Sequence, residues 1–164
     1  MTAIVNGAPF MLARICAAIL LAGVCSLALA NASAWVQTSS GQDNTDGNGP
    51  SLHTEYVVPN SIHSIRGGYR EAFVKVTYAP GVELGASGDA ATTEISQVMV
   101  GCSDLSWGDA QTMYFDKNMT PVLADTGEWD HTKPVWVLKN MQPLSPDSIT
   151  YRTAQYICRA ATPT

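Results

Sequence analysis

The sequence is short of basic side chains and of histidine. Nine Lys and Arg residues stand against fourteen Asp and Glu residues, and no basic cluster occurs along the chain. A chain of this charge is a poor binder of nucleic acid and of anionic membrane surfaces. The three histidines, His53, His63 and His131, do not follow the spacing of any common metal site.

Recognisable catalytic motifs are also absent. The sequence has no G-x-S-x-G elbow, no P-loop and no dinucleotide-binding glycine pattern. Asp130 and His131 are adjacent, but neighbours on an extended chain point to opposite sides. We therefore expect a protein that is not an enzyme, with no catalytic residue, no cofactor and no metal site. An enzyme whose motif the sequence hides is a remote alternative.

The first 34 residues read as a secretory signal. Arg14 is the only charge before an apolar run, Ile15–Ala30, that is shorter than the about 20 residues needed to span a bilayer. Small residues at Ala32 and Ala34 then form an A-x-A cleavage pattern. We place the cut after Ala34, although cuts after Ala30 or Ala32 fit nearly as well. An uncleaved anchor and a lipoprotein are alternatives, and Val24 directly before Cys25 disfavours the second.

Removing this segment leaves 130 residues, a formal net charge of −6 and two cysteines, Cys102 and Cys158. Two cysteines in an exported chain most simply form a disulfide, and two free buried thiols are the alternative. We expect the protein in the periplasm or on the outer surface of the cell. Membrane contact is expected only during export or through an uncleaved N-terminal segment.

Residues 35–52 are predicted to form a flexible tether, since Thr38–Ser51 has no large apolar side chain. The stretch "NTDGNGPSLHTE" resembles an EF-hand loop in its oxygen-bearing side chains. No helical pattern flanks it and its first residue is Asn44, so we favour a solvated linker over a calcium site. The folded domain is expected over residues 53–164.

Strand patterns dominate this domain. Ala72, Val74, Val76 and Tyr78 alternate along a strand that follows a turn at Gly67-Gly68 and ends at Pro80-Gly81. Further strands are expected at 54–59, at 92–102, at 133–140 and in two runs around a turn at 116–118. Val98, Val100 and Cys102 share one face of their strand. Strands at this spacing without helices between them predict an antiparallel meander.

A helix closes the chain. Ser145 is the expected N-cap and Pro146 the first helical residue. At about 100° per residue the helix has one thin polar stripe and buries most of its remaining surface on the sheet. Cys158 lies on the buried side, which is compatible with a bond to Cys102. The polar stripe consists of Ser148, Arg152, Gln155 and Arg159.

The order of these features resembles the surface-adhesin protein E family of bacteria, over about Trp35 to Ala160. The resemblance implies an α+β fold, a twisted antiparallel β-sheet meander with one C-terminal α-helix packed on a face, and cysteines paired in this arrangement. It also implies adhesion, with host matrix proteins as candidate partners and homodimers as a plausible state. The matching stretches are Trp35-Val36, Asn60-Ser61-Ile62, "SQVMVGC", "MYFDKNMTPV" and "PDSITYRTAQYIC".

No binding residue can be singled out from the sequence. Trp107, Trp129 and Trp136 are interface candidates, because exposed aromatic residues anchor interfaces, but each could equally cover the sheet. An acidic partner could contact the scattered basic residues, which more often only keep a surface soluble. These basic residues are Arg66, Arg70, Lys75, Lys133 and Lys139.

The sequence therefore predicts an exported, non-catalytic binding protein of the bacterial cell envelope, with adhesion to host extracellular-matrix proteins as its candidate role. A periplasmic structural or scaffold protein without adhesive activity is the main alternative. Pairing of an exposed sheet edge with a second copy would give a homodimer.

Overall fold

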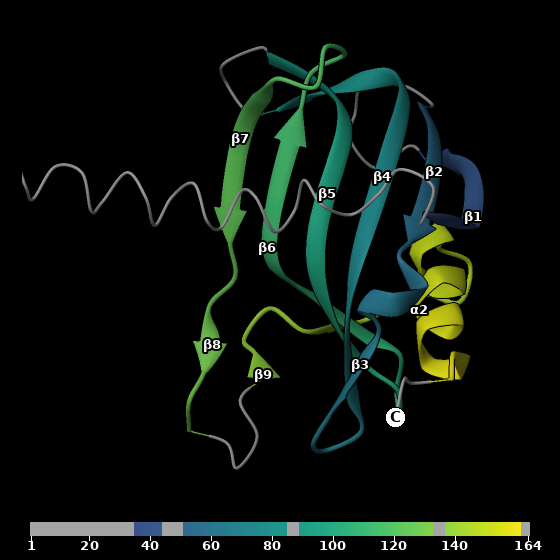
Figure 1. Ribbon diagram of the computed structural model, residues 1–164, viewed down its shortest axis with the longest axis vertical. Helices are drawn as coiled ribbons and strands as arrows, with labels where there is room; N and C mark the ends of the chain where they lie inside the picture. Colours follow the sequence, from purple (N-terminus) through teal and green to yellow (C-terminus); the bar gives the residue numbers. More distant parts are fainter. Residues whose placement is uncertain (1–34, 44–50, 85–88, 133–136, 162–164) are drawn as a thin grey trace, which may run out of the picture. The chain divides into compact units, whose positions relative to one another are not determined.

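Alternating apolar residues form the sheet, as the sequence predicts. The computed structural model describes residues 35–43, 51–84, 89–132 and 137–161 (Figure 1). Within them, no helix is long and apolar enough to cross a membrane. The elements are β1 (Val36–Asp43), β2 (Ser51–Val57), the 3-10 helix η2 (Pro59–Ser61), β3 (His63–Ile65), β4 (Tyr69–Leu84), β5 (Asp89–Gly101), β6 (Ser106–Phe115), β7 (Pro121–Thr126), β8 (Trp129–Asp130), β9 (Val137–Leu138), β10 (Gln142–Pro143) and α2 (Ile149–Arg159).

The strands form a curled antiparallel sheet in the order β1-β2-β4-β5-β6-β10. β3 pairs with β4, and β7 pairs with β6 beyond the end of β10. Strands β8 and β9 pair separately as a small second sheet. Figure 1 shows the long strands β4, β5 and β6 at the centre, with α2 beside β1 and β2. The predicted antiparallel sheet and C-terminal helix are therefore both present.

The main core lies between the sheet and α2. Val74 and Val98 are fully or almost fully buried, and they pack with Ala154 and Ile157 of the helix. Side chains two positions apart on a strand share a face, so Val100 joins the same cluster as Val98. We call this side of the sheet the helix face.

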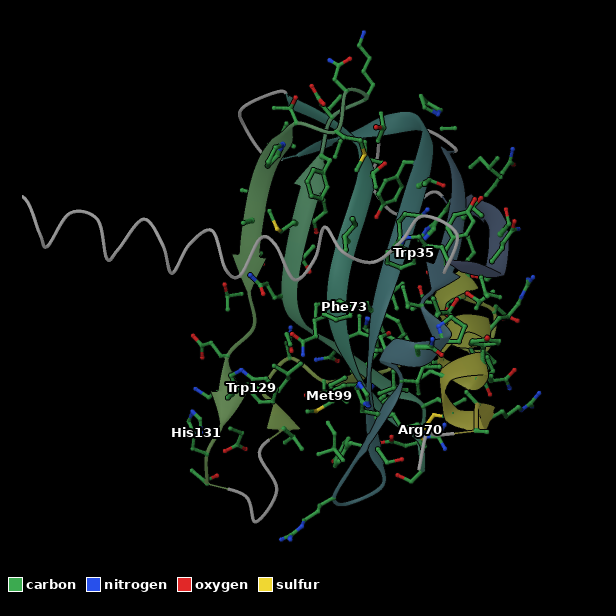
Figure 2. All side chains as sticks on the ribbon, viewed as in Figure 1. Trp35, Arg70, Phe73, Met99, Trp129 and His131 are labelled. Atoms are coloured by element: carbon green, nitrogen blue, oxygen red, sulfur yellow. A yellow bond between two sulfur atoms is a disulfide. The ribbon has the colours of Figure 1, made fainter. Side chains whose placement is uncertain are left out.

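A second cluster lies on the opposite side of β5. Met99 is 1% exposed and packs with Ala110, Val137 and Leu138. Half-buried Trp129 of β8 covers the same cluster, in the position labelled in Figure 2. Alternation along β5 therefore sends Val98 and Met99 into two separate cores.

Two predicted turns are confirmed. Gly67 and Gly68 have φ values of 84° and 81° in the turn between β3 and β4, a region that side chains with a Cβ rarely adopt. The β6–β7 turn follows Asp116, whose Oδ1 accepts hydrogen bonds from the N–H groups of Asn118 and Thr120, both at 2.8 Å. The prediction that Pro80-Gly81 ends its strand is wrong, because β4 continues to Leu84 past a shift in register.

The predicted tether is also wrong over Val36–Asp43, which forms the edge strand β1. β1 pairs with β2, and the hydroxyl groups of Thr38 and Ser39 face the helix. Thr38 Oγ1 and Ser39 Oγ lie 2.7 and 2.9 Å from Thr153 Oγ1 on α2. Hydrogen bonds replace apolar burial here, so a search for large apolar side chains missed the strand. Residues 44–50 lie outside the described part of the chain, and the domain boundaries remain predictions.

The helix begins three residues later than predicted. Ser148 is the N-cap, and its Oγ accepts a hydrogen bond from the Tyr151 N–H. Ser145 instead accepts hydrogen bonds through its carbonyl oxygen, from both the N–H and the Oγ of Ser148. The predicted orientation holds, since Arg152 and Arg159 are exposed while the apolar side is buried.

Candidate functional site

Strand register places a row of polar side chains on the helix face. Directly paired residues on neighbouring antiparallel strands point to the same side of a sheet. Because Val98 faces α2, its partner Asp109 on β6 does so too. Pairing continues the row in both directions, through His53↔Tyr78, Glu94↔Tyr114 and Thr112↔Asp125.

At one end of this row Glu55 is buried under α2, with 1% of its surface exposed. Its Oε1 accepts a hydrogen bond from Thr150 Oγ1 at 2.7 Å and lies 3.0 Å from His53 Nε2. Ser39 Oγ donates to its Oε2 at 3.3 Å. Burial alone would raise the pKa of Glu55, but hydrogen bonds from His53, Thr153 and Thr150 outweigh it and lower the pKa. Glu55 is thus a buried charged group that joins β1, β2 and α2.

In the middle of the row a chain of hydrogen bonds crosses from β4 to β6. Tyr78 Oη donates to Glu94 Oε2 at 2.6 Å, and Ser96 Oγ donates to Glu94 Oε1 at 2.8 Å. Ser96 Oγ is also 2.9 Å from Thr112 Oγ1. Both Glu94 oxygens are occupied, which fixes the carboxylate on the helix face.

The row ends in a cavity between β6, β7 and the segment after β9. Its volume is about 390 Å³. Carboxyl, hydroxyl and amide groups dominate the wall, and histidine and cysteine do not occur in its described lining. The lining consists of Asp109, Thr112, Tyr114, Asp125, Thr126, Gly127, Glu128, Lys139 and Asn140.

Asp109 has the most strongly altered acidity in this cavity. Burial raises the pKa of Asp109 to about 6, and the negative charge of Glu94 acts in the same direction. A hydrogen bond from Trp107 Nε1, 3.0 Å long, opposes the rise. Burial and the same carboxylates raise the pKa of Tyr114 to about 12. The cavity therefore holds a carboxyl group that exchanges its proton near neutral pH beside a phenol that stays protonated.

The predicted tryptophans have separate surroundings. Half-buried Trp107 packs against the main core and donates its hydrogen bond to Asp109. Trp129 packs against the second cluster. Trp136 lies outside the described residues. The two described tryptophans therefore contribute to packing and do not form a joint aromatic surface.

The basic residues are dispersed as well. Arg70 reaches the end of α2, where its Nη1 donates to the carbonyl oxygens of Ile157 and Ala160, both at 2.6 Å (Figure 2). Lys75 lies on the opposite side of the sheet, with Nζ 4.4 Å from the Tyr56 ring centre and 5.1 Å from that of Trp35. Lys139 is 3.0 Å from Glu128 at the cavity rim. Arg66 is exposed, and Lys133 lies outside the described residues.

The predicted cysteine pair is present. Cys102 follows β5 and Cys158 lies on α2, and the two form a disulfide across 56 residues of sequence. No group of three or more acidic, histidine or cysteine side chains in the described residues is arranged to hold a metal ion. Most of the calcium-loop candidate, from Asn44 to Gly49, lies outside those residues, and its final carboxylate belongs to buried Glu55.

Sequence reasoning did not find Glu94, Asp109 and Tyr114. A signal was available, because alternation places Glu94 on the same side of its strand as Val98 and Val100. A carboxylate on the apolar side of a strand is unusual unless it has partners. The partner strand could not be read from the sequence without its register, and a bulge between Gln97 and Val98 shifts that register.

Comparisons with known proteins give little. No family model matches the chain, and no curated protein matches it. A search of solved structures finds the structure of Haemophilus influenzae protein E, with 16% sequence identity and a TM-score of 0.40, over 75% of this chain and 86% of that one. This likeness is too distant to place the chain in a family.

Proposed function

We propose that this chain is an exported, non-catalytic binding protein of a bacterial cell envelope. The disulfide between Cys102 and Cys158 carries the proposal, because such bonds persist in oxidising compartments and are rare in the cytosol. The N-terminal sequence, with its short apolar run and A-x-A sites, agrees with export. We further propose that its partners are host matrix proteins, as the family resemblance of the sequence implies.

The cavity between β6 and β7 is the binding site that we propose for this role. Its volume lies within the range of small ligand sites, about 300–1,000 Å³. Two carboxyl groups, Asp109 and Asp125, face it without a basic side chain bonded to either in the described residues, whereas Glu128 pairs with Lys139. Such a site suits a ligand that brings an ammonium or guanidinium group, such as a lysine or arginine side chain of a matrix protein.

Protease treatment of intact cells tests the location. We expect surface-exposed protein to be degraded before the outer membrane is opened. Protection until the membrane is opened would contradict an adhesive role and favour the periplasmic scaffold. The full-length protein is detected with an antibody to the domain. A periplasmic enzyme serves as the control that should stay protected until the membrane is opened.

Binding to immobilised fibronectin, laminin and collagen tests the ligand class. We expect saturable binding to at least one protein, weakened in Asp125→Asn by about fivefold, since a surface-exposed ion pair is worth up to about 1 kcal/mol. Asp147→Asn is the matched control, because Asp147 is exposed at the start of α2 and outside the cavity. Absence of saturable binding, or equal loss in the two variants, would sink the cavity as the binding site.

One observation favours an enzyme as the second candidate. Burial raises the pKa of Asp109 to about 6, close to the pH at which general acid–base catalysis is most efficient. A hydrogen-bonded pair of nucleophile and base is missing from the described lining of the cavity. Turnover of a chromogenic glycoside or ester that disappears in Asp109→Asn would replace the binding proposal.

A further inference from the structure

A second hollow, of about 490 Å³, lies between η2 and the polar stripe of α2. Two guanidinium groups, of Arg152 and Arg159, face it from the helix. Both side chains are exposed, and neither forms a hydrogen bond or an ion pair within the described residues. Part of the polar stripe that periodicity predicts thus forms one wall of a groove, which we call the arginine groove.

We propose that the arginine groove binds an acidic peptide segment of a partner protein, through carboxylates that pair with Arg152 and Arg159. This proposal goes beyond the proposed function, because it concerns a different site and a ligand of opposite charge. Guanidinium groups suit the task, since their planar fork donates two parallel hydrogen bonds to one carboxylate.

The geometry favours two carboxylates over one. Arg152 and Arg159 are seven positions apart on the helix, which places their Cα atoms about 10 Å apart along the axis. Three residues of a polyproline II segment span about 9 Å and place side chains three positions apart on the same side. One segment with two acidic side chains can therefore engage both arginines, and acidic residues do not occur in the described lining of the groove.

The C-terminal end of a helix normally repels anions, because its last carbonyl groups point outward. Here Arg70 offsets that effect, because its guanidinium binds the carbonyl oxygens of Ile157 and Ala160 at 2.6 Å. Ala160 itself lines the groove. The third guanidinium therefore makes this end of α2 compatible with a negative ligand.

The remaining wall favours a peptide over a sulfated polysaccharide. Asn60 and Gln155 present amide groups that can bond to a peptide backbone, and Tyr156 and Pro59 add apolar surface. A polysaccharide with many sulfates needs a longer basic surface than the two arginines of this groove provide. Two arginines match a short acidic segment.

The test is a titration at neutral pH and low ionic strength with acetylated, amidated hexaglutamate, hexaglutamine serving as the neutral peptide. We expect saturable binding of hexaglutamate alone, weakened at least tenfold in Arg152→Gln/Arg159→Gln, which removes two charged hydrogen-bonding groups. Arg66→Gln/Lys117→Gln loses the same charge at exposed positions outside the groove, and we expect less than a twofold change. Equal weakening in both double variants would overturn the proposal.

A second measurement protects the test against a variant that fails to fold. Resonances of the Arg152 and Arg159 guanidinium groups in the unaltered protein should shift on titration with hexaglutamate, while that of Arg66 should not. Shifts with a heparin oligosaccharide but none with hexaglutamate would replace the peptide by a polysaccharide and overturn the proposal. Saturation by inorganic phosphate at the same concentration as hexaglutamate would likewise reduce the groove to a general anion site.

Discussion

Asp109 is the residue whose chemistry depends most on its surroundings. The half-buried carboxyl lies beside Glu94, Asp125 and Tyr114 in the cavity between β6 and β7. Burial raises its pKa to about 6, so the folded protein holds this proton more tightly than the unfolded chain does. The ionised form is therefore a source of instability at neutral pH.

We expect Asp109→Asn to stabilise the fold at neutral pH by about 1–2 kcal/mol. The stability of the unaltered protein should fall as pH rises through about 6, because folding then requires a buried charge. Asparagine keeps an oxygen for the hydrogen bond from Trp107 and has no charge to bury. The gain should shrink toward zero as pH falls to about 4, where the folded carboxyl is protonated. Urea unfolding across this pH range measures it.

Asp147→Asn is the matched control, because Asp147 is exposed at the start of the helix. It should change the free energy of unfolding by less than about 0.5 kcal/mol at every pH. A gain in Asp109→Asn that is the same at pH values above and below 6 would contradict the titration of Asp109 as its cause.

At the scale of elements, α2 depends on contacts at both of its ends. Ser148 caps the first turn, and Thr150 donates a hydrogen bond to Glu55 of β2. Arg70 closes the last turn from β4. The sequence predicted the buried side of this helix correctly because periodicity is local. It placed the first residue wrongly because Ser145 and Ser148 are both good caps, and only the path of the chain from β10 selects between them.

Arg70→Met should destabilise the protein by about 1–3 kcal/mol, because two carbonyl groups at the end of α2 lose a charged donor. The loss should be local as well, with faster hydrogen exchange at the Ala160 N–H, which donates to the Tyr156 carbonyl oxygen. Arg66→Met, at the nearby exposed turn, is the control and should cost less than about 0.5 kcal/mol. Equal losses in the two variants would show that Arg70 does not hold the helix end.

At the scale of the whole molecule, one covalent bond joins the last element to the sheet. Replacing both Cys102 and Cys158 by alanine should lower the free energy of unfolding by about 4 kcal/mol, from the loop of 56 residues that the disulfide closes. Chemical denaturation of the purified domain measures the loss. A reducing agent should reproduce it in the unaltered protein and have no effect on the double variant. Two free thiols in the exported protein by mass spectrometry would contradict the bond.

Local pattern was enough for much of this fold. Alternation along Ala72–Tyr78 and at Val98 and Val100 gave the buried faces of β4 and β5, and Gly67-Gly68 gave the turn before β4. The cysteine pairing could be predicted because the expected cleavage after Ala34 leaves only two cysteines, Cys102 and Cys158. Each of these features depends on neighbours in sequence or on the number of cysteines. Both can be read from a single sequence.

The candidate sites depended on pairing between distant segments. Val36–Asp43 is polar, and it becomes a strand because β2 pairs with it and because Thr153, 114 residues beyond Ser39, binds its hydroxyl groups. Asp109 acquires its raised pKa only when folding buries it, and β5 and β7 then add the negative charges of Glu94 and Asp125. The sequence by itself determined which side chains are apolar, alternating or able to cap. The tertiary structure decided which polar groups lie together, because the register between strands determines which side chains on neighbouring strands are paired.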